Sequence, residues 1–166
     1  SKVQLTLGCR QLEKQQLFSK SDPVVGVFCF RDGAWKLVGN TERKENEHDP
    51  NFVNSILVDH YSKVDQLLQF RVFQTDEDKV LKPTHVFAQT EETKLSAILE
   101  SSNLLALQDV KGKATKSSMV IRSLHLKPKG TSVAFTIRVA GKKLFGASDT
   151  IEIPDSVVVL YSAQSG

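Results

Sequence analysis

Short segments in which apolar and polar residues alternate constrain the fold of this chain more than any other feature. The clearest is residues 67–74, where Leu68, Phe70 and Val72 alternate with polar residues. An alternation with a period of two places the apolar side chains on one face of an extended strand. The pattern therefore predicts β-strands that bury one face.

Eight segments of strand character occur in the first part of the chain, and polar loops separate them. They cover residues 3–9, 24–30, 35–41, 52–59, 67–74, 85–89, 103–108 and 117–126. Asp32-Gly33 is a hairpin turn signal, and residues 95–99 have the apolar spacing of one or two helical turns. Many short strands with regularly spaced turns are typical of a sandwich. We therefore expect an all-β, eight-stranded antiparallel β-sandwich over residues 1–127.

The pattern begins again after a linker at residues 128–131. Four apolar residues then alternate with polar ones: Val133, Phe135, Ile137 and Val139. Residues 144–149 also repeat the Leu, Phe, Ser and Asp of residues 17–22. A segment of about 35 residues cannot bury a core of its own. We expect residues 132–166 to be the start of a second, incomplete copy of the domain or a docking tail.

Composition adds constraints on location and chemistry. No apolar run among the 166 residues approaches the roughly 20 that a membrane-spanning helix needs, and the first residues lack the pattern of a secretion signal. Cys9 and Cys29 stand alone in apolar surroundings, which predicts buried thiols rather than a disulfide or a metal site. We expect a cytoplasmic protein whose contact with membranes is peripheral.

Positive charge collects in the second half of the chain. Residues 93–166 carry 10 basic and 5 acidic side chains, whereas residues 1–92 carry 12 and 14. One basic stretch contains no acidic residue: Lys111, Lys113, Lys116, Arg122, Lys127 and Lys129. This stretch could meet phosphates of lipid or nucleic acid, or it could be a solvated edge strand with its loops. Nucleic acid is the less favoured partner because no stacking aromatic residues are interleaved with the lysines.

The sequence contains no recognisable catalytic motif. The four histidines, His48, His60, His85 and His125, are scattered along the chain. No pair of them has the HExxH spacing, and there is neither a GxSxG elbow nor a P-loop. The sequence therefore indicates a binding module rather than an enzyme.

The order of motifs resembles that of a C2 domain. An alternating first strand is followed by Ser21-Asp22-Pro23 at a loop exit, where the proline directs the chain into a strand. Thr41 then precedes a loop with a proline and an aromatic residue at residues 49–52, and the strand at residues 67–74 follows. Residues 17–23 and 57–61, with the strand at 66–73, are most similar to the first C2 domain of the copine family.

This resemblance implies a peripheral membrane module. C2 domains of the calcium-dependent kind hold Ca²⁺ between loops at one end of the sandwich, and the ions bridge to anionic phospholipids. A copine-like C2 module would thus recruit a larger protein to anionic phospholipid membranes, and residues 132–166 would open a second C2 domain. The alternative is a degenerate C2 scaffold that mediates protein–protein interaction without lipid or calcium.

The calcium ligands implied by the resemblance are only partly present. Asp22 is in place, but Gln16 stands where an earlier aspartate is expected. The expected Asp-x-Asp falls on Gln74-Thr75-Asp76, and no carboxylate stands at residues 82–85. Ca²⁺ prefers about 6 to 8 oxygen ligands, and its affinity falls as charged ligands are removed. Asp22, Asp76 and Asp78 are therefore weak metal candidates, and we expect weakened calcium dependence or none.

Two other groups of residues are candidates for lipid contact. Lys36, Arg43 and Lys44 lie on or beside the third strand, where related C2 domains carry a basic patch for phosphoinositides. Three acidic residues beside them oppose this attraction: Glu42, Glu45 and Glu47. Four apolar residues could insert as loop tips: Leu17, Phe18, Val80 and Leu81. Phe18 could equally belong to the core.

Overall fold

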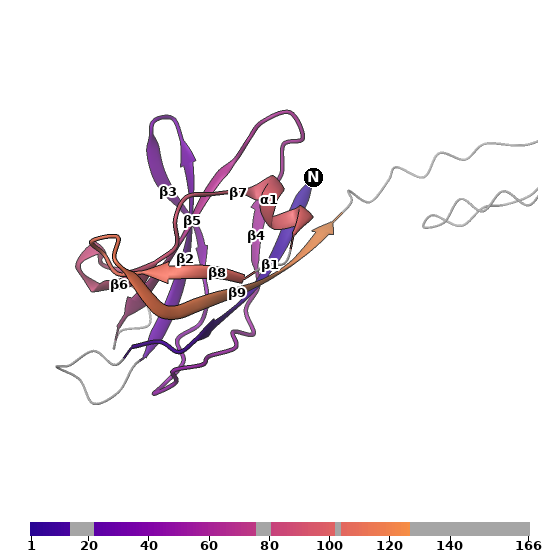
Figure 1. Ribbon diagram of the computed structural model, residues 1–166. Helices are drawn as coiled ribbons and strands as arrows, with labels where there is room; N and C mark the ends of the chain where they lie inside the picture. Colours follow the sequence, from indigo (N-terminus) through magenta and orange to yellow (C-terminus); the bar gives the residue numbers. More distant parts are fainter. Residues whose placement is uncertain (14–21, 76–80, 102–103, 127–166) are drawn as a thin grey trace, which may run out of the picture. The chain divides into compact units, whose positions relative to one another are not determined.

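The computed structural model describes residues 1–13, 22–75, 81–101 and 104–126 (Figure 1). The chain divides into two compact units, Ser1–Leu126 and Lys127–Gly166, and every described residue belongs to the first. The linker and second copy predicted at residues 128–166 lie outside the described residues and stay predictions.

The described residues form nine strands, one short α-helix and one 3-10 turn. The strands are β1 (Lys2–Arg10), β2 (Pro23–Arg31), β3 (Ala34–Asn40), β4 (Ile56–Asp59), β5 (Leu67–Gln74), β6 (Val86–Gln89), β7 (Thr93–Lys94), β8 (Leu104–Gln108) and β9 (Ala114–Leu126). The helix is α1 (Leu95–Glu100), and the 3-10 turn is η1 (Pro83–His85). Among the described residues, no helix has the length and apolar character needed to cross a membrane.

The strands pair antiparallel throughout and make two layers. One layer has the order β3-β2-β5-β6, and the other has the order β8-β9-β1-β4. A single pair, Gln89 with Gln108, joins β6 to β8 and links the layers along one edge. The additional strand β7 pairs with the start of β5. The predicted all-β antiparallel sandwich is confirmed.

All eight predicted strands are present, but the ends of two differ by three residues or more. β4 begins at Ile56 rather than at residue 52. Before it, the chain pairs with β1 through an isolated bridge between Asn51 and Gly8, which is not part of a continuous ladder. Phe52 is nevertheless buried, and its backbone N–H donates to the carbonyl of Leu7 at 3.0 Å. β9 begins at Ala114, three residues before the predicted start, and β7 was not predicted because two residues carry no periodicity.

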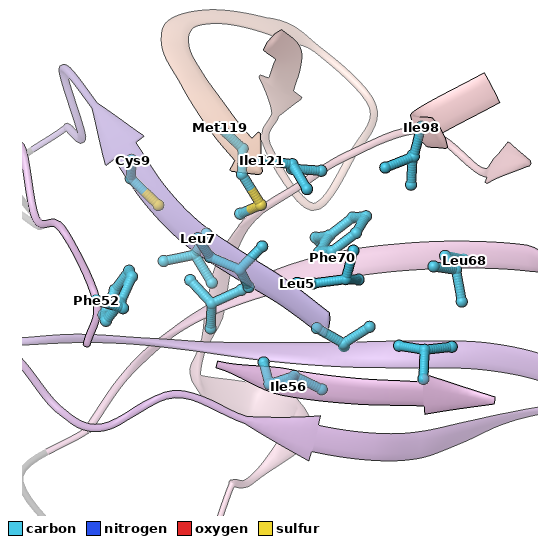
Figure 2. Close-up of a cluster of buried hydrophobic side chains, with 14 of the residues drawn as sticks. Leu5, Leu7, Cys9, Phe52, Ile56, Leu68, Phe70, Ile98, Met119 and Ile121 are labelled. Carbon is cyan, nitrogen blue, oxygen red and sulfur yellow. The ribbon is translucent and has the colours of Figure 1, made fainter. Parts of the chain in front are cut away.

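Alternate residues of both layers face inward and form one core (Figure 2). From β1, Val3, Leu5, Leu7 and Cys9 are each at most 3% exposed. The facing layer contributes Val25, Val27, Cys29, Leu68, Phe70 and Val72. Fully burying an apolar side chain of this size stabilises a fold by roughly 1.5–3 kcal/mol. The apolar residues that alternate in the sequence are thus the residues that the fold buries.

Both cysteines are buried and free, as the sequence predicts. Burial raises the pKa of the Cys9 thiol to about 12, although the neighbouring Arg10 lowers it. Cys9 is therefore a neutral thiol at physiological pH and contributes to packing rather than to nucleophilic or metal chemistry.

The strand registers define two ends of the sandwich. Arg10 of β1 pairs with Ser118 near the start of β9, and Pro23 pairs with Gln74. The connections 11–22, 41–55, 75–85 and 109–113 therefore leave the strands at the same end, called the loop end from here on. The β2–β3 turn, residues 60–66 and α1 belong to the opposite end. Figure 1 shows the β8–β9 turn far from α1 and the N-terminus.

Candidate functional site

Asp22 lies at the loop end, immediately before β2, and each of its two carboxylate oxygens has a partner. Oδ1 accepts a hydrogen bond from the backbone N–H of Asn46 at 2.9 Å. Oδ2 lies 3.5 Å from Nη1 of Arg43 in an ion pair whose two side chains are only 15% and 20% exposed. Asn46 has a positive φ of 53°, a conformation that asparagine tolerates better than most residues.

The backbone of Asp22 is held as firmly as its side chain. Its N–H donates to Oε1 of Gln74 at 3.0 Å, and its carbonyl accepts from the N–H of Thr75 at 3.4 Å. Gln74 stands where the resemblance to calcium-binding C2 domains implies a ligand aspartate. In this chain its side chain instead contacts the backbone that positions Asp22.

These contacts bear on whether the site fits calcium. A calcium ion at Asp22 would have to compete with the N–H of Asn46 and with the guanidinium of Arg43, which Asp22 shares with Glu45. Within the described ranges, no group of three or more His, Cys, Asp or Glu residues is placed to hold a metal ion. The described residues of the loop end therefore do not fit a calcium ion. The other two candidates, Asp76 and Asp78, lie outside the described residues.

The cations predicted to contact lipid are separated by the fold, and each faces a carboxylate. Lys36 pairs with Asp32 at 2.6 Å, beside the β2–β3 turn at the end opposite the loop end. Arg43 and Lys44 lie at the loop end, where Arg43 also pairs with Glu45 at 3.0 Å. Lys44 is 3.7 Å from Glu42. These carboxylates offset the positive charge of the three residues.

Glu42 also organises the connection that carries Arg43 and Lys44. Its two carboxylate oxygens accept hydrogen bonds from the backbone N–H groups of Val53 at 2.6 Å and Asn54 at 2.9 Å. Burial alone would raise the pKa of Glu42, but the hydrogen bonds from Val53 and Asn54 and the charge of Lys44 hold this pKa below its ordinary value. The ionised carboxylate is thus part of the folded loop.

The turn between β8 and β9 presents lysines that have no carboxylate partner among the described residues. We call residues 109–116 the lysine hairpin; Lys111, Lys113 and Lys116 in it are exposed. In the part of the chain that the structure describes, no carboxylate lies within 4 Å of any of their ammonium groups. The neighbouring Val110 is 55% exposed. The lysine hairpin is a basic surface at the loop end, the end where Asp22 also lies.

Residues within the lysine hairpin fix the conformation of its backbone. Oδ1 of Asp109 accepts hydrogen bonds from the N–H groups of Lys111 and Lys113, both at 2.8 Å. Gly112 takes a positive φ of 82°, which glycine adopts without strain. The lysines therefore project from a defined turn.

Of the four predicted apolar tips, Leu17, Phe18 and Val80 lie outside the described residues. Leu81 is partly exposed and precedes η1 at the loop end.

Two contacts between distant parts of the sequence were missed. His60 and His125 are 65 positions apart in the sequence, which gave no sign of a contact, yet their rings meet edge to face with centroids 4.9 Å apart. They meet because β4 and β9 pair with opposite sides of β1. The ion pair between Arg43 and Asp22 was also missed, since 21 residues separate its partners and no sequence period links them.

Comparisons with known proteins agree with this architecture. Among curated relatives, the chain is 28% identical to Copine-D and 30% identical to Copine-B, both of Dictyostelium discoideum, over 143 and 149 residues. These alignments cover 82% and 86% of this chain but 27% and 28% of the relatives, so the chain spans about a quarter of their length.

Solved structures show the same fold at low sequence identity. A structure named BON1-C2B is 17% identical, has a TM-score of 0.54, and matches over 75% of this chain and 92% of its own. A C2 domain of plant Extended Synaptotagmin 1 is 18% identical, has a TM-score of 0.53, and matches over 76% and 96%. The family model of the C2 domain matches residues 3–91, more than half of the chain. The chain belongs to the C2 domain family.

Proposed function

We propose that this C2 domain recruits a larger protein to anionic phospholipid membranes, that its loop end makes the contact, and that calcium contributes little. The protein would then be cytoplasmic and peripheral to the membrane, with a binding role rather than a catalytic one. The similarity to copines over about a quarter of their length supports a module within a longer chain.

The observation that carries this proposal is the combination of charges at the loop end. The carboxylate of Asp22 is ion-paired with Arg43 within the chain itself, while Lys111, Lys113 and Lys116 have no carboxylate partner among the described residues. Each Lys or Arg near an anionic membrane contributes about 1 kcal/mol of attraction. Three lysines thus supply fixed positive charge where a calcium-dependent C2 domain uses bound ions.

Vesicle co-sedimentation in excess chelator tests the location of this contact. We expect binding to vesicles of phosphatidylcholine with phosphatidylserine and none to phosphatidylcholine alone. Replacing Lys111, Lys113 and Lys116 together by Gln should weaken binding about a hundred-fold, the equivalent of about 3 kcal/mol. The matched control replaces Lys2, Lys63 and Lys94 by Gln. These three lysines lie at the opposite end, and their replacement removes the same amount of positive charge. Equal losses in the two variants would refute the assignment to the lysine hairpin.

A second function is favoured by a specific observation. Lys36, Arg43 and Lys44, the predicted phosphoinositide patch, each pair with a carboxylate. This pairing is the arrangement expected of a degenerate C2 scaffold that contacts only proteins. Absence of binding to any anionic vesicle, with or without calcium, would favour that scaffold over the membrane module.

A further inference from the structure

A depression of about 280 Å³ lies at the end of the sandwich opposite the loop end. Its walls come from the end of β2 and from the connection between β4 and β5, and they include Phe30, Arg31, Tyr61 and Val64. Pockets for small molecules usually enclose about 300–1,000 Å³. The depression is therefore suited to a single bulky side chain rather than to a large cofactor.

Three apolar side chains of the depression are exposed to solvent in a fixed arrangement. Phe30, Tyr61 and Val64 are 44%, 51% and 62% exposed. The ring of Phe30 packs edge-on against Trp35 with centroids 5.3 Å apart. Apolar side chains that gather on a surface, rather than occur singly, mark a contact site for a partner.

A buried glutamine fixes the wall of the depression that the β4–β5 connection forms. Gln66 is 6% exposed, and its Oε1 accepts a hydrogen bond from the backbone N–H of Tyr61 at 2.8 Å. Its Nε2 donates to the carbonyl of Asp59 at 2.6 Å. The wall that carries Tyr61 and Val64 is thus formed before any partner binds, so little ordering entropy opposes binding.

The charges around the depression leave a positive surplus. Its two carboxylates are already in ion pairs, Asp32 with Lys36 at 2.6 Å and Asp65 with Lys94 at 2.8 Å. The guanidinium of Arg31 lies 5.9 Å from the centre of the Tyr61 ring. Within the described ranges, no carboxylate lies within 4 Å of the charged groups of Arg31 or Lys63. The surplus favours an anionic partner.

We infer that this end of the domain binds an acidic peptide segment of a partner protein that carries one bulky apolar residue. The apolar side chain fills the depression between Phe30, Tyr61 and Val64. Acidic neighbours of that residue meet Arg31, whose planar guanidinium suits carboxylate recognition, and Lys63. Because this site and the lysine hairpin lie at opposite ends, one domain can hold a partner and a membrane together.

An NMR titration of the isotope-labelled domain with the synthetic peptide Glu-Glu-Phe-Glu-Glu tests the inference. We expect saturable shifts at the backbone amides of Arg31, Tyr61 and Val64, and much weaker ones with Glu-Glu-Ala-Glu-Glu. Arg31→Gln should weaken binding about 10- to 100-fold, the loss of one hydrogen bond to a charged group. Tyr61→Ala should weaken it as well. Both side chains are at the surface, and the melting temperature of each variant reports whether it folds.

Lys113→Gln is the matched control, since it removes one positive charge at the other end of the domain. Equal binding of the two peptides, or equal effects of Arg31→Gln and Lys113→Gln, would overturn the inference. So would the absence of saturable shifts in the wild-type domain. Arg31→Gln should retain binding to phosphatidylserine vesicles, so failure of this site is distinguishable from failure of the membrane proposal.

Discussion

Asp22 shows at the scale of single residues how the partners of a carboxylate decide its chemistry. Its oxygens accept from the N–H of Asn46 and face the guanidinium of Arg43. Part of the negative charge that would attract a metal ion is therefore offset by Arg43, whose guanidinium also pairs with Glu45. Because that cation is covalently attached, its presence does not depend on the calcium concentration.

The two hydrogen bonds that Glu42 accepts lead to a prediction about stability. Replacing it by Gln should lower the free energy of unfolding by about 1–2 kcal/mol at neutral pH, because an amide cannot accept both backbone N–H groups as the carboxylate does. Chemical denaturation measures this loss, with Glu92→Gln as the control at an exposed position. A loss as small as that of the control would contradict the role given to Glu42.

The contribution of Glu42 to the free energy of unfolding depends on pH in a defined direction. The pKa of Glu42 is lower in the folded chain than its ordinary value of 4.5, so the folded state favours the ionised form. This contribution is fully present above the ordinary pKa and is lost as the pH falls through and below it. The difference in unfolding free energy between wild type and Glu42→Gln should therefore stay constant from neutral pH down to about the ordinary pKa of 4.5 and shrink as the pH falls through and below that value. A difference that grew with acid would contradict the assignment.

At the scale of elements, a buried threonine continues the hydrogen bonding between two strands beyond the end of one of them. Thr41 follows β3 and is 2% exposed; its Oγ1 accepts from the N–H of Val25 at 2.9 Å. Thr41→Val keeps the shape but leaves that N–H unsatisfied, which should cost about 1–3 kcal/mol of unfolding free energy. Thr93→Val, at a less buried position, is the control. Equal stability of wild type and Thr41→Val would refute this role.

The elements themselves were largely predictable because burial on one face imposes a period of two. All eight strands were found from alternation and turn residues, and the Asp32-Gly33 turn was found because Gly33 supplies a positive φ. The early start of β9 was not found. Residues 114–116 include no large apolar side chain and are exposed or half-buried, and they join the strand through pairing of β8 with β9 rather than through burial.

The candidate site was less predictable for a physical reason. Asp22 was identified from its motif, and the three lysines of the lysine hairpin from their charge. Their common position at the loop end follows from the register of β9 against β1, which depends on contacts across more than 100 residues. The partners Arg43 and Asn46 likewise depend on the path of a loop. Local sequence patterns carry no information about such contacts.

At the scale of the whole described unit, the two ends of the sandwich differ in surface chemistry. The loop end has the lysine hairpin and a carboxylate, that of Asp22, paired with Arg43. The opposite end has the aromatic depression beside Arg31. The strands and their shared core connect these ends rigidly, since every layer contributes to one cluster of buried side chains. The two sites that we propose, one for a membrane and one for a partner, thus lie at opposite ends of one unit.

The calcium dependence of binding to phosphatidylserine vesicles tests the central claim most directly. The affinity of the wild-type domain is measured in excess chelator and again in millimolar calcium, with magnesium as the control for divalent charge. Fixed lysines and an Asp22 that is paired with Arg43 predict binding in chelator, with no appreciable gain from calcium over magnesium. Binding that appears only when calcium is added would contradict the account.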